Sequence, residues 1–194
     1  MDNPAKGTLI AVSGPSGVGK STLIERFLVQ DSESAFSISY TTRRRRNHEI
    51  DGKDYYFVDE NTFRAMAGNG LFLEWEEVHG YLYGTPKSEI LQILKTGKDI
   101  FLDIDVKGAL NIKKQCPVAQ LIFVEAPSLN ILKERLSLRG EHEIETRMKR
   151  VEEEIARKDQ FGYTIINDDL NETYETFKSV ITSIRRQKNG KNNC

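Results

Sequence analysis

At residues 14 to 21 the chain reads Gly14-Pro15-Ser16-Gly17-Val18-Gly19-Lys20-Ser21, directly after the short apolar run Thr8 to Val12. This stretch matches G-x-x-x-x-G-K-[ST], the pattern of a phosphate-binding loop, or P-loop. Glycines let the backbone curl so that successive N–H groups converge on phosphate oxygens, and a helix from Lys20 to about Gln30 adds the positive end of its dipole. The stretch therefore predicts a buried strand, a phosphate-binding turn and a helix, in that order.

Two side chains of the P-loop suit nucleotide chemistry. Lys20 is placed to reach the β- and γ-phosphates of a nucleoside triphosphate, and the Ser21 hydroxyl is a candidate ligand of Mg²⁺. The alternative is a glycine turn that precedes a helix by chance, which we expect in about one chain of this size in a hundred. The candidate nucleotide-binding residues are Gly14, Pro15, Ser16, Gly17, Val18, Gly19, Lys20, Ser21 and Thr22.

Apolar, strand-like runs alternate with helix-period segments along the rest of the chain. The later runs are Ile100 to Ile104, Leu121 to Val124 and Tyr163 to Ile166, and helical segments begin near Pro86, Val106 and Ser128. A last amphipathic helix is expected from about Glu172 to Arg186. This alternation predicts an α/β fold with a parallel sheet core and flanking helices.

Two segments depart from that alternation. Between Phe36 and Tyr83 the chain has short alternating pieces, turn signals and little helical pattern, which predicts a β-rich insertion. The charged piece from Arg139 to Thr146 is typical of a mobile flap. We expect a single domain over residues 1–194, with a core of 1–35, 86–134 and 160–194, an insertion of 36–85 and a small helical lid of 135–159.

Composition excludes several classes of protein. The 194 residues carry 28 basic and 29 acidic side chains, so a general nucleic-acid coat protein is not expected. The longest apolar runs fall far short of the roughly 20 residues that a membrane span needs, and the N-terminus has no export signal. The two cysteines, Cys116 and Cys194, form no disulfide framework. A cytoplasmic protein without membrane or nucleic-acid partners is expected.

Asp103 and Asp105 come at the end of the predicted strand Ile100 to Ile104. Ligands of open α/β sheets bind at the carboxyl ends of the strands, and two residues spaced by two face the same side. Asp103 is therefore a candidate Mg²⁺ partner, through water, together with Ser21. The alternative is that Asp105 caps the next helix while Asp103 is solvated.

A P-loop alone leaves GTPases, ATPases and many kinases open, and the segment after it narrows the choice. The chain carries Thr41-Thr42-Arg43-x-x-Arg46-x-x-Glu49-x-x-Gly52-x-x-Tyr55-x-Phe57, followed by Glu74-Trp75, Tyr83-Gly84-Thr85, Leu102-Asp103-Ile104-Asp105, Arg139-Gly140 and Asn167-Asp168-Asp169. With these motifs the sequence resembles guanylate kinase over nearly its whole length. The resemblance implies a P-loop kinase that phosphorylates GMP with ATP.

By this resemblance an acceptor site for GMP lies on the insertion. The phosphate of GMP would be held by two arginines and two tyrosines, whose guanidinium and hydroxyl groups donate to a dianion: Arg43, Arg46, Tyr55 and Tyr83. Arg44 and Arg45 fall at variable positions and are expected to face solvent, while Glu49 would orient one of the arginines. The resemblance assigns the base to Ser39, Glu74, Thr85 and Asp105, beside Gly84.

Glu74 is the residue expected to select guanine. A carboxylate accepts from the N1–H and N2–H₂ donors of guanine, whereas adenine presents an acceptor at N1. Ser39 and Thr85 hydroxyls can donate to O6. Taken alone, Glu74 is more simply an exposed strand residue beside Glu76 and Glu77, and only the resemblance favours the site.

On the donor side, the lid arginines of the family match Arg135, Arg139 and Arg150, candidates for neutralising the transferring phosphoryl group. Asn167 resembles the residue beside the ATP adenine, although Asn167 or Asp168 capping the following helix is an equally simple interpretation. Lys20 and Arg43 complete the candidate catalytic set.

The implied reaction is ATP + GMP ⇌ ADP + GDP with Mg²⁺, in purine nucleotide metabolism, and dGMP is a further expected acceptor. Two other classes remain open. One is a non-catalytic guanylate-kinase-like binding module, although such modules typically lack the complete P-loop that this chain keeps. The other is a related P-loop kinase with a different acceptor, such as a ribose bisphosphate. The oligomeric state is not predicted.

Overall fold

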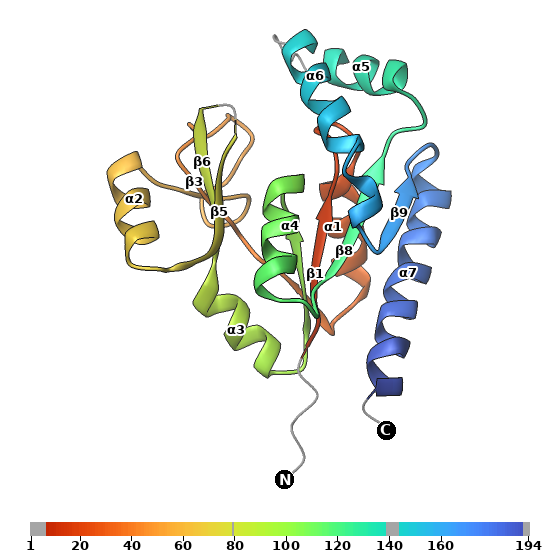
Figure 1. Cartoon of the computed structure of the whole chain (residues 1–194), viewed down its shortest axis with the longest axis horizontal. Coiled ribbons are helices and arrows are strands. Elements are labelled where there is room, and N and C mark those ends of the chain that lie inside the picture. Colours follow the sequence, from red (N-terminus) through yellow and green to blue (C-terminus); the bar gives the residue numbers. More distant parts are fainter. Residues whose placement is uncertain (1–6, 79, 139–143, 192–194) are drawn as a thin grey trace.

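A computed structural model describes residues 7–78, 80–138 and 144–191 of the chain (Figure 1). Its centre is a five-stranded sheet in the order β2-β7-β1-β8-β9, in which every neighbouring pair is parallel. The strands are β1 (Leu9–Ser13), β2 (Ser34–Phe36), β7 (Asp99–Asp103), β8 (Gln120–Glu125) and β9 (Tyr163–Ile166). The parallel α/β fold expected from the alternation is confirmed.

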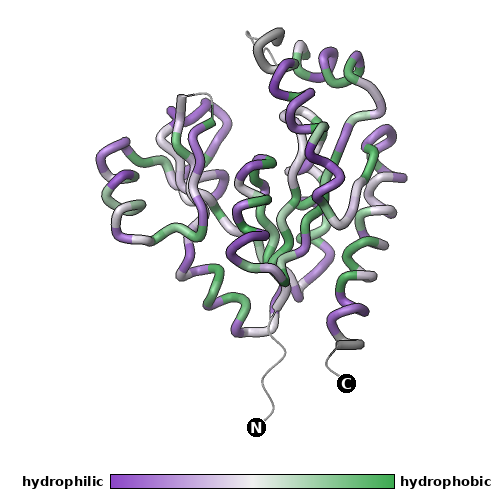
Figure 2. Tube along the Cα trace, viewed as in Figure 1, coloured by the Kyte–Doolittle hydropathy of each residue, from purple (hydrophilic) through white to green (hydrophobic). Residues whose placement is uncertain are grey.

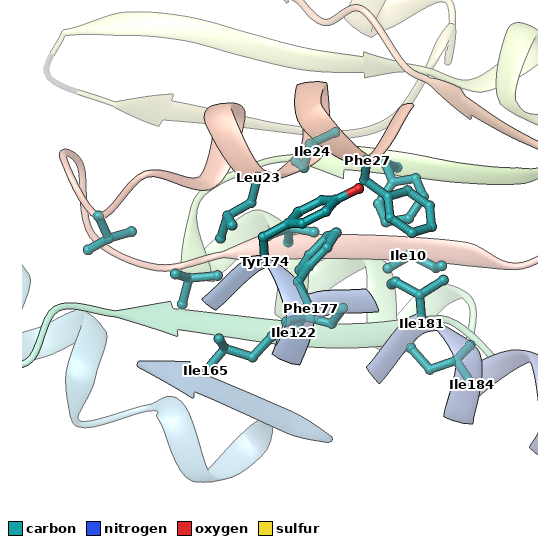
Figure 3. Packing of buried hydrophobic residues seen from close by; sticks show 14 of the residues in the cluster. Ile10, Leu23, Ile24, Phe27, Ile122, Ile165, Tyr174, Phe177, Ile181 and Ile184 are labelled. Carbon is teal, nitrogen blue, oxygen red and sulfur yellow. The ribbon is translucent and has the colours of Figure 1, made fainter. Parts of the chain in front are cut away.

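Helices cover both faces of this sheet. On one face, α1 (Lys20–Gln30) and α7 (Leu170–Lys191) pack on side chains such as Ile10 and Ile122 (Figure 3). On the other face, α3 (Lys87–Lys95) and α4 (Val106–Gln115) pack on Leu9 and Ala11. Consecutive β1 residues thus supply opposite cores, because successive strand side chains point to opposite faces. In Figure 2 the sheet runs as an apolar band between more polar helices.

Residues of the expected insertion build a separate, smaller sheet in the order β4-β3-β6-β5. Its strands are β3 (Tyr40–Thr41), β4 (Tyr56–Phe57), β5 (Phe72–Val78) and β6 (Tyr81–Pro86). Phe63 and Phe72 stack with ring centroids 4.6 Å apart in its own apolar core. The insertion stands beside the main sheet (Figure 1).

The insertion also contains α2 (Glu60–Gly68), a helix that the sequence pattern did not assign. Asp59 caps it by accepting from the backbone N–H of Thr62 at 2.9 Å, and Glu60 places an acid in its first turn. An aspartate followed by an acidic first turn is a helix-start signal. This signal was available in the sequence and could have located α2.

Two further helices lie over the carboxyl end of the central strands (Figure 1). They are α5 (Leu129–Leu138) and α6 (Ile144–Ile155), followed by a short 3₁₀ turn (Lys158–Gln160) that leads into β9. These helices fall in and beside the segment expected to form the lid. Among the described helices, none is long and apolar enough to cross a membrane.

Candidate active site

The P-loop joins the end of β1 to the start of α1. Gly14, Gly17 and Gly19 have φ angles of 133°, 88° and 95°, which side chains of L-residues rarely adopt. A Cβ atom at Gly14 would lie 2.0 Å from the backbone oxygen of Val124. Gly19 precedes α1 and has no side chain to cap it. α1 therefore begins without a side-chain cap, and the N–H groups of its first turn are candidates for binding an anion.

Lys20 and Ser21 begin α1 and turn toward β7. The Lys20 Nζ atom donates to the backbone oxygens of Gly14 at 2.7 Å and Pro15 at 3.2 Å, and lies 3.9 Å from Asp103 Oδ1. Ser21 Oγ donates to Asp103 Oδ2 at 2.6 Å. β1 and β7 are paired with Val12 opposite Asp103, so the sheet register brings this carboxylate to the P-loop.

This arrangement decides between the two interpretations of the aspartate pair. Asp103 is not merely solvated, because its carboxylate binds the Ser21 hydroxyl. Asp105 does cap α4, as the alternative expected: its Oδ1 accepts from the backbone N–H of Gly108 at 2.7 Å. Its Oδ2 also accepts from Arg150 Nη2 at 3.0 Å. Asp105 therefore connects the core to α6.

The Ser21 and Asp103 oxygens fit Mg²⁺ in chemistry, because this hard cation takes oxygen ligands and commonly keeps only one or two protein carboxylates. Within the described ranges, no three His, Cys, Asp or Glu residues are grouped to hold a metal ion. Any Mg²⁺ bound here would need further oxygens, which nucleotide phosphates and water provide.

The arginine segment is held by a carboxylate. Arg43 donates to both oxygens of Glu49, at 2.6 and 3.0 Å, and the backbone N–H of Arg46 donates to Glu49 at 2.8 Å. Burial acts against ionisation of Glu49, yet these hydrogen bonds lower its pKa below the usual range. Glu49 therefore orients Arg43, as expected from the sequence.

Two tyrosines lie beside this ion pair. The Arg43 guanidinium is 5.5 Å from the ring centroid of Tyr55, whose ring is 5.9 Å from that of Tyr83. Burial raises the pKa of Tyr55, so its hydroxyl stays a neutral donor. Burial acts to lower the pKa of Arg43, but Glu49 and the nearby Tyr83 hydroxyl raise it. Three of the four residues expected around the acceptor phosphate are thus adjacent.

The other arginines of the run are exposed at their side chains. Arg44 faces solvent as expected. Arg45 does so only in part, because its Nη1 donates to the backbone oxygen of Glu49 at 2.9 Å and thereby ties the turn together. Arg46 contributes its backbone N–H to the Glu49 carboxylate, while its side chain is on the surface.

Glu74 is buried, so its interpretation as an exposed strand residue is wrong. β5 and β6 pair with Glu74 opposite Thr85, and Thr85 Oγ1 donates to Glu74 Oε1 at 2.6 Å. The residue is only 8% exposed. Burial, together with the charges of Asp105 and Glu76, raises its pKa to about 7, although the Thr85 hydrogen bond acts to lower it.

The space around Glu74 is open on one side and tight on another. A cavity of about 280 Å³ is lined by Glu74 together with residues of α2, β5 and α4. A Cβ atom at Gly108 of α4 would lie 2.8 Å from Glu74 Oε2, so the helix approaches the carboxylate closely. Ser39, half-buried, precedes β3. A Cβ atom at Gly84 would lie 2.9 Å from the ring atoms of Phe63 and Phe72, so the glycine leaves room for both rings.

Arg150 and Glu154 of α6 form an ion pair beside Asp105. Arg150 Nε donates to Glu154 Oε1 at 3.2 Å while its Nη2 binds Asp105. Burial raises the pKa of Glu154, and the charges of Lys20 and Arg150 act against that rise. Sequence reasoning missed Glu154, although its spacing of four from Arg150 on one helix was a signal for this pair.

Arg135 and Asn167 meet on the other side of the P-loop. Arg135 donates from Nη1 to the Asn167 backbone oxygen at 3.0 Å and from Nη2 to that of Asp168 at 3.3 Å. The Asn167 amide donates to the Val18 backbone oxygen at 2.6 Å. Asp169, not Asn167 or Asp168, accepts from the first N–H groups of α7. The capping interpretation of those two residues is therefore wrong. Arg139 lies outside the described residues.

Comparison with known proteins places the chain among characterised relatives. The model of the family described as "Guanylate kinase" matches residues 6–184. A guanylate kinase of Carboxydothermus hydrogenoformans is 44% identical over 181 residues, covering 92% of this chain and 89% of its own. One from Thermus thermophilus is 42% identical over 185 residues, covering 94% of this chain and 84% of its own.

Solved structures agree at the level of the fold. The crystal structure of guanylate kinase from Anaplasma phagocytophilum superposes with a TM-score of 0.78 at 30% identity, covering 95% of this chain and 87% of its own. A shikimate kinase from Bacteroides thetaiotaomicron is similar with a TM-score of 0.50 at 14% identity, covering 90% and 98%. The latter likeness shows the fold alone.

Proposed function

This chain belongs to the guanylate kinase family and is an ATP:GMP phosphotransferase, and on that premise we propose which of its residues perform the reaction and that dGMP is a second acceptor. The observation that carries the assignment is Glu74: a buried carboxylate, held by Thr85, on the insertion that also presents Arg43. A carboxylate in that setting suits a base with two adjacent N–H donors.

The donor nucleotide is proposed to lie on the P-loop. Backbone N–H groups of residues 14–22 hold its phosphates, and Lys20 leaves the carbonyls of Gly14 and Pro15 for the β- and γ-phosphates. Ser21 and Asp103 would hold Mg²⁺, Asp103 through water, and the bound ion would neutralise charge on the phosphates. This proposal rests on the meeting of those two oxygens beside Lys20.

The acceptor phosphate is proposed to bind on the insertion. Arg43 and Arg46 donate to it, with the Tyr55 and Tyr83 hydroxyls beside them. Glu49 keeps Arg43 extended and ionised before the substrate arrives, so little side-chain entropy is lost on binding. Because these side chains are already held in position, the site favours a phosphate dianion of matching geometry.

The base of the acceptor is proposed to lie against the Glu74 carboxylate on the insertion. Glu74 accepts from guanine N1–H and N2–H₂, and the Ser39 and Thr85 hydroxyls donate to O6, with Asp105 at the edge and the Gly84 backbone alongside. AMP would set an N1 acceptor against the carboxylate. Leaving such a buried group unpaired is costly, so the arrangement favours strong rejection of adenine.

The chemical step needs no general base. The nucleophile is an oxygen of the GMP phosphate, already ionised near neutral pH, and the γ-phosphoryl group passes to it while ADP leaves. Lys20, Arg43, Arg135, Arg139 and Arg150 are proposed to stabilise the charge on that group. Positioning and charge neutralisation therefore supply the catalysis.

The lid and the insertion are proposed to close around the substrates. The proposed units are the core (1–35, 86–134 and 160–194), the insertion (36–85) and the lid (135–159). The contact of Arg150 with Asp105 supports a lid that meets the acceptor side. Closure would exclude water that otherwise hydrolyses ATP. Asn167 is proposed to lie close to the adenine of ATP.

The cellular setting is proposed from the substrates. ATP, GMP and dGMP are small nucleotides of purine metabolism, and we place their conversion in the cytoplasm without a nucleic-acid or membrane partner. The free thiol of Cys116 supports a reducing compartment.

The test is an ADP-release assay with five acceptors: GMP, dGMP, AMP, CMP and UMP. We expect turnover with GMP and dGMP, and kcat/KM for AMP lower by about 10³-fold or more. Comparable rates with AMP and GMP would overturn the guanine assignment. Turnover with none of the five would favour a P-loop kinase with a different acceptor.

A further inference from the structure

The buried amide of Asn167 contacts the P-loop backbone rather than another side chain. Its Nδ2 atom donates to the backbone oxygen of Val18 at 2.6 Å, across 149 positions of sequence. Asn167 is only 5% exposed. Val18 lies in the stretch whose N–H groups are proposed to bind the donor phosphates, so this hydrogen bond acts on the conformation of the phosphate site.

The geometry of the peptide group gives this contact a direction. In a trans peptide the carbonyl of one residue and the N–H of the next point to opposite sides, and the chain has no cis peptide bond among its described residues. When Asn167 holds the Val18 carbonyl on its side, the N–H of Gly19 points away from Asn167. That N–H is then turned to the phosphate side of the loop.

Gly19 fits this contact closely. A Cβ atom at position 19 would lie 2.5 Å from Asn167 Nδ2, and the φ angle of Gly19 is 95°. The amide therefore occupies space that any other residue at position 19 would fill. The glycine serves two purposes here: it permits the turn of the loop, and it lets Asn167 reach the carbonyl next to it.

Asn167 is itself held in place from two directions. Its backbone N–H donates to the backbone oxygen of Glu125 at 2.8 Å, which extends the pairing of β8 with β9 by one residue. Its backbone oxygen accepts from Nη1 of Arg135 on α5, and Nη2 of Arg135 donates to the backbone oxygen of Asp168. The planar guanidinium binds these two carbonyls from two nitrogens held in a fixed geometry, whereas the ammonium of a lysine would have to bind both from a single nitrogen. Asn167 therefore links the P-loop to Arg135, at the start of the proposed lid.

We propose that Asn167 is a positioning residue for the P-loop: by holding the Val18 carbonyl it aims the Gly19 N–H at the donor phosphates, and Arg135 holds Asn167 in place for this task. The proposal rests on the proposed binding of ATP to the P-loop. It gives Asn167 a role toward the phosphates that is separate from any contact with the adenine.

The test uses tripolyphosphate with Mg²⁺, which presents the phosphates of ATP without a base. Asn167→Asp keeps the shape of the side chain but sets a carboxylate oxygen against the Val18 carbonyl. We expect the Kd of tripolyphosphate, measured by calorimetry on the full chain, to rise about tenfold or more. The Kd values of ATP and GTP should rise by the same factor, while that of GMP stays unchanged.

Asn171→Asp is the matched control, because it adds the same charge in the same stretch of chain. Asn171 is exposed and its Oδ1 accepts from Arg26 at 2.9 Å, away from the P-loop. This variant should bind tripolyphosphate as the wild type does. An equal loss in both variants would mean that added charge, not the Val18 contact, causes the effect, and would overturn the proposal.

The outcomes separate two roles of Asn167. If Asn167→Asp weakens ATP but leaves tripolyphosphate unchanged, Asn167 acts on the base and the positioning role is wrong. The outcome for GMP phosphorylation by the wild-type chain is independent: its failure would overturn the proposed function, not this contact.

Arg135→Lys provides a second variant should Asn167→Asp fail to fold. It keeps the positive charge but replaces the two nitrogens that bind the Asn167 and Asp168 oxygens by a single nitrogen. We expect a smaller rise in the Kd of tripolyphosphate, about threefold, with thermal unfolding close to that of the wild type. A wild-type Kd for this variant would contradict the role of Arg135 in holding Asn167.

Discussion

The regions proposed to bind the donor and the acceptor nucleotide are built in different ways. The donor region is a continuous stretch of backbone, residues 14–22, whose glycines adopt φ angles closed to other residues. The proposed acceptor region is assembled from side chains of β3, β5, β6 and their loops, and its central charged groups are already paired within the protein: Arg43 with Glu49, and Glu74 with Thr85. A phosphate site made of backbone N–H groups needs few side chains, whereas a selective pocket made of side chains depends on every one of its residues.

This difference has an electrostatic cause. Backbone N–H groups carry partial charges whose directions are set by the fold. A buried carboxylate or guanidinium must instead have partners, because an unpaired buried charge is costly. We therefore expect the proposed donor region to accept different triphosphates, and the proposed acceptor region to decide which monophosphate reacts. Substitutions in the proposed donor region should therefore lower the rate of catalysis, whereas substitutions in the proposed acceptor region should change how well each monophosphate is used.

The largest effect is expected in the donor region. Lys20→Met removes the cation beside Gly14, Pro15 and Asp103. We expect kcat to fall by about 10³-fold or more, because loss of one group that stabilises transition-state charge typically has this size. Steady-state kinetics measure the loss, and circular dichroism with thermal unfolding shows whether the fold is kept. Turnover close to that of the wild type would remove Lys20 from the mechanism.

Next in size is the change at the guanine position. Glu74→Gln replaces one acceptor oxygen by a donor, so we expect the KM of GMP to rise roughly 10²-fold while that of ATP stays within about twofold. Glu76→Gln is the control, since Glu76 lies on the same strand and binds Asn111 instead. An equal rise for ATP and GMP would show that the acceptor region is not selective in the way proposed.

A smaller effect is expected at the acceptor phosphate. Arg43→Lys keeps the charge but cannot bind both oxygens of Glu49 and a phosphate in a fixed plane, so the KM of GMP should rise about thirtyfold. Arg44→Lys, at an exposed neighbour, should leave it unchanged. Kinetics at saturating ATP compare the two variants. An equal KM of GMP in the two variants would mean that the ion pair with Glu49 does not position Arg43 for the phosphate.

The smallest effect is a pH dependence confined to the acceptor region. Burial raises the pKa of Glu74 to about 7. Guanine donates to the ionised carboxylate, whose fraction falls as the pH drops below 7, so the KM of GMP should rise about tenfold from pH 8 to pH 6. The GMP phosphate also titrates near pH 6. Glu74→Gln controls for it, because the variant keeps only that part of the profile.

A flat KM for GMP over this pH range in the wild type would contradict the proposed contact between Glu74 and the base. The KM of ATP provides the comparison across regions, because Glu74 is not assigned to the donor phosphates and its protonation should leave that KM unchanged.

Much of the fold followed from local patterns, and the misses have physical causes. The limits of α1 and β9 agree with the sequence, because glycines and apolar runs mark them. α2 was missed although Asp59 and Glu60 mark its start, because its short apolar stripe packs on a sheet that only the tertiary structure forms. Glu154 was missed because its neighbours Lys20 and Asp105 are remote in sequence.

The resemblance to guanylate kinase implied that Glu49 orients an arginine, and the structure identifies Arg43 as that residue. The sequence by itself determined the parts that depend on neighbouring residues: the P-loop motif and the strand and helix that flank it. Such parts follow from the chemistry of a few consecutive residues. Only the tertiary structure decided that Glu74 is buried against Thr85, that Asp105 joins α6 through Arg150, and that Asn167 holds the Val18 carbonyl. Burial and pairing over long separations depend on which strands and helices pack together, and no local pattern records that.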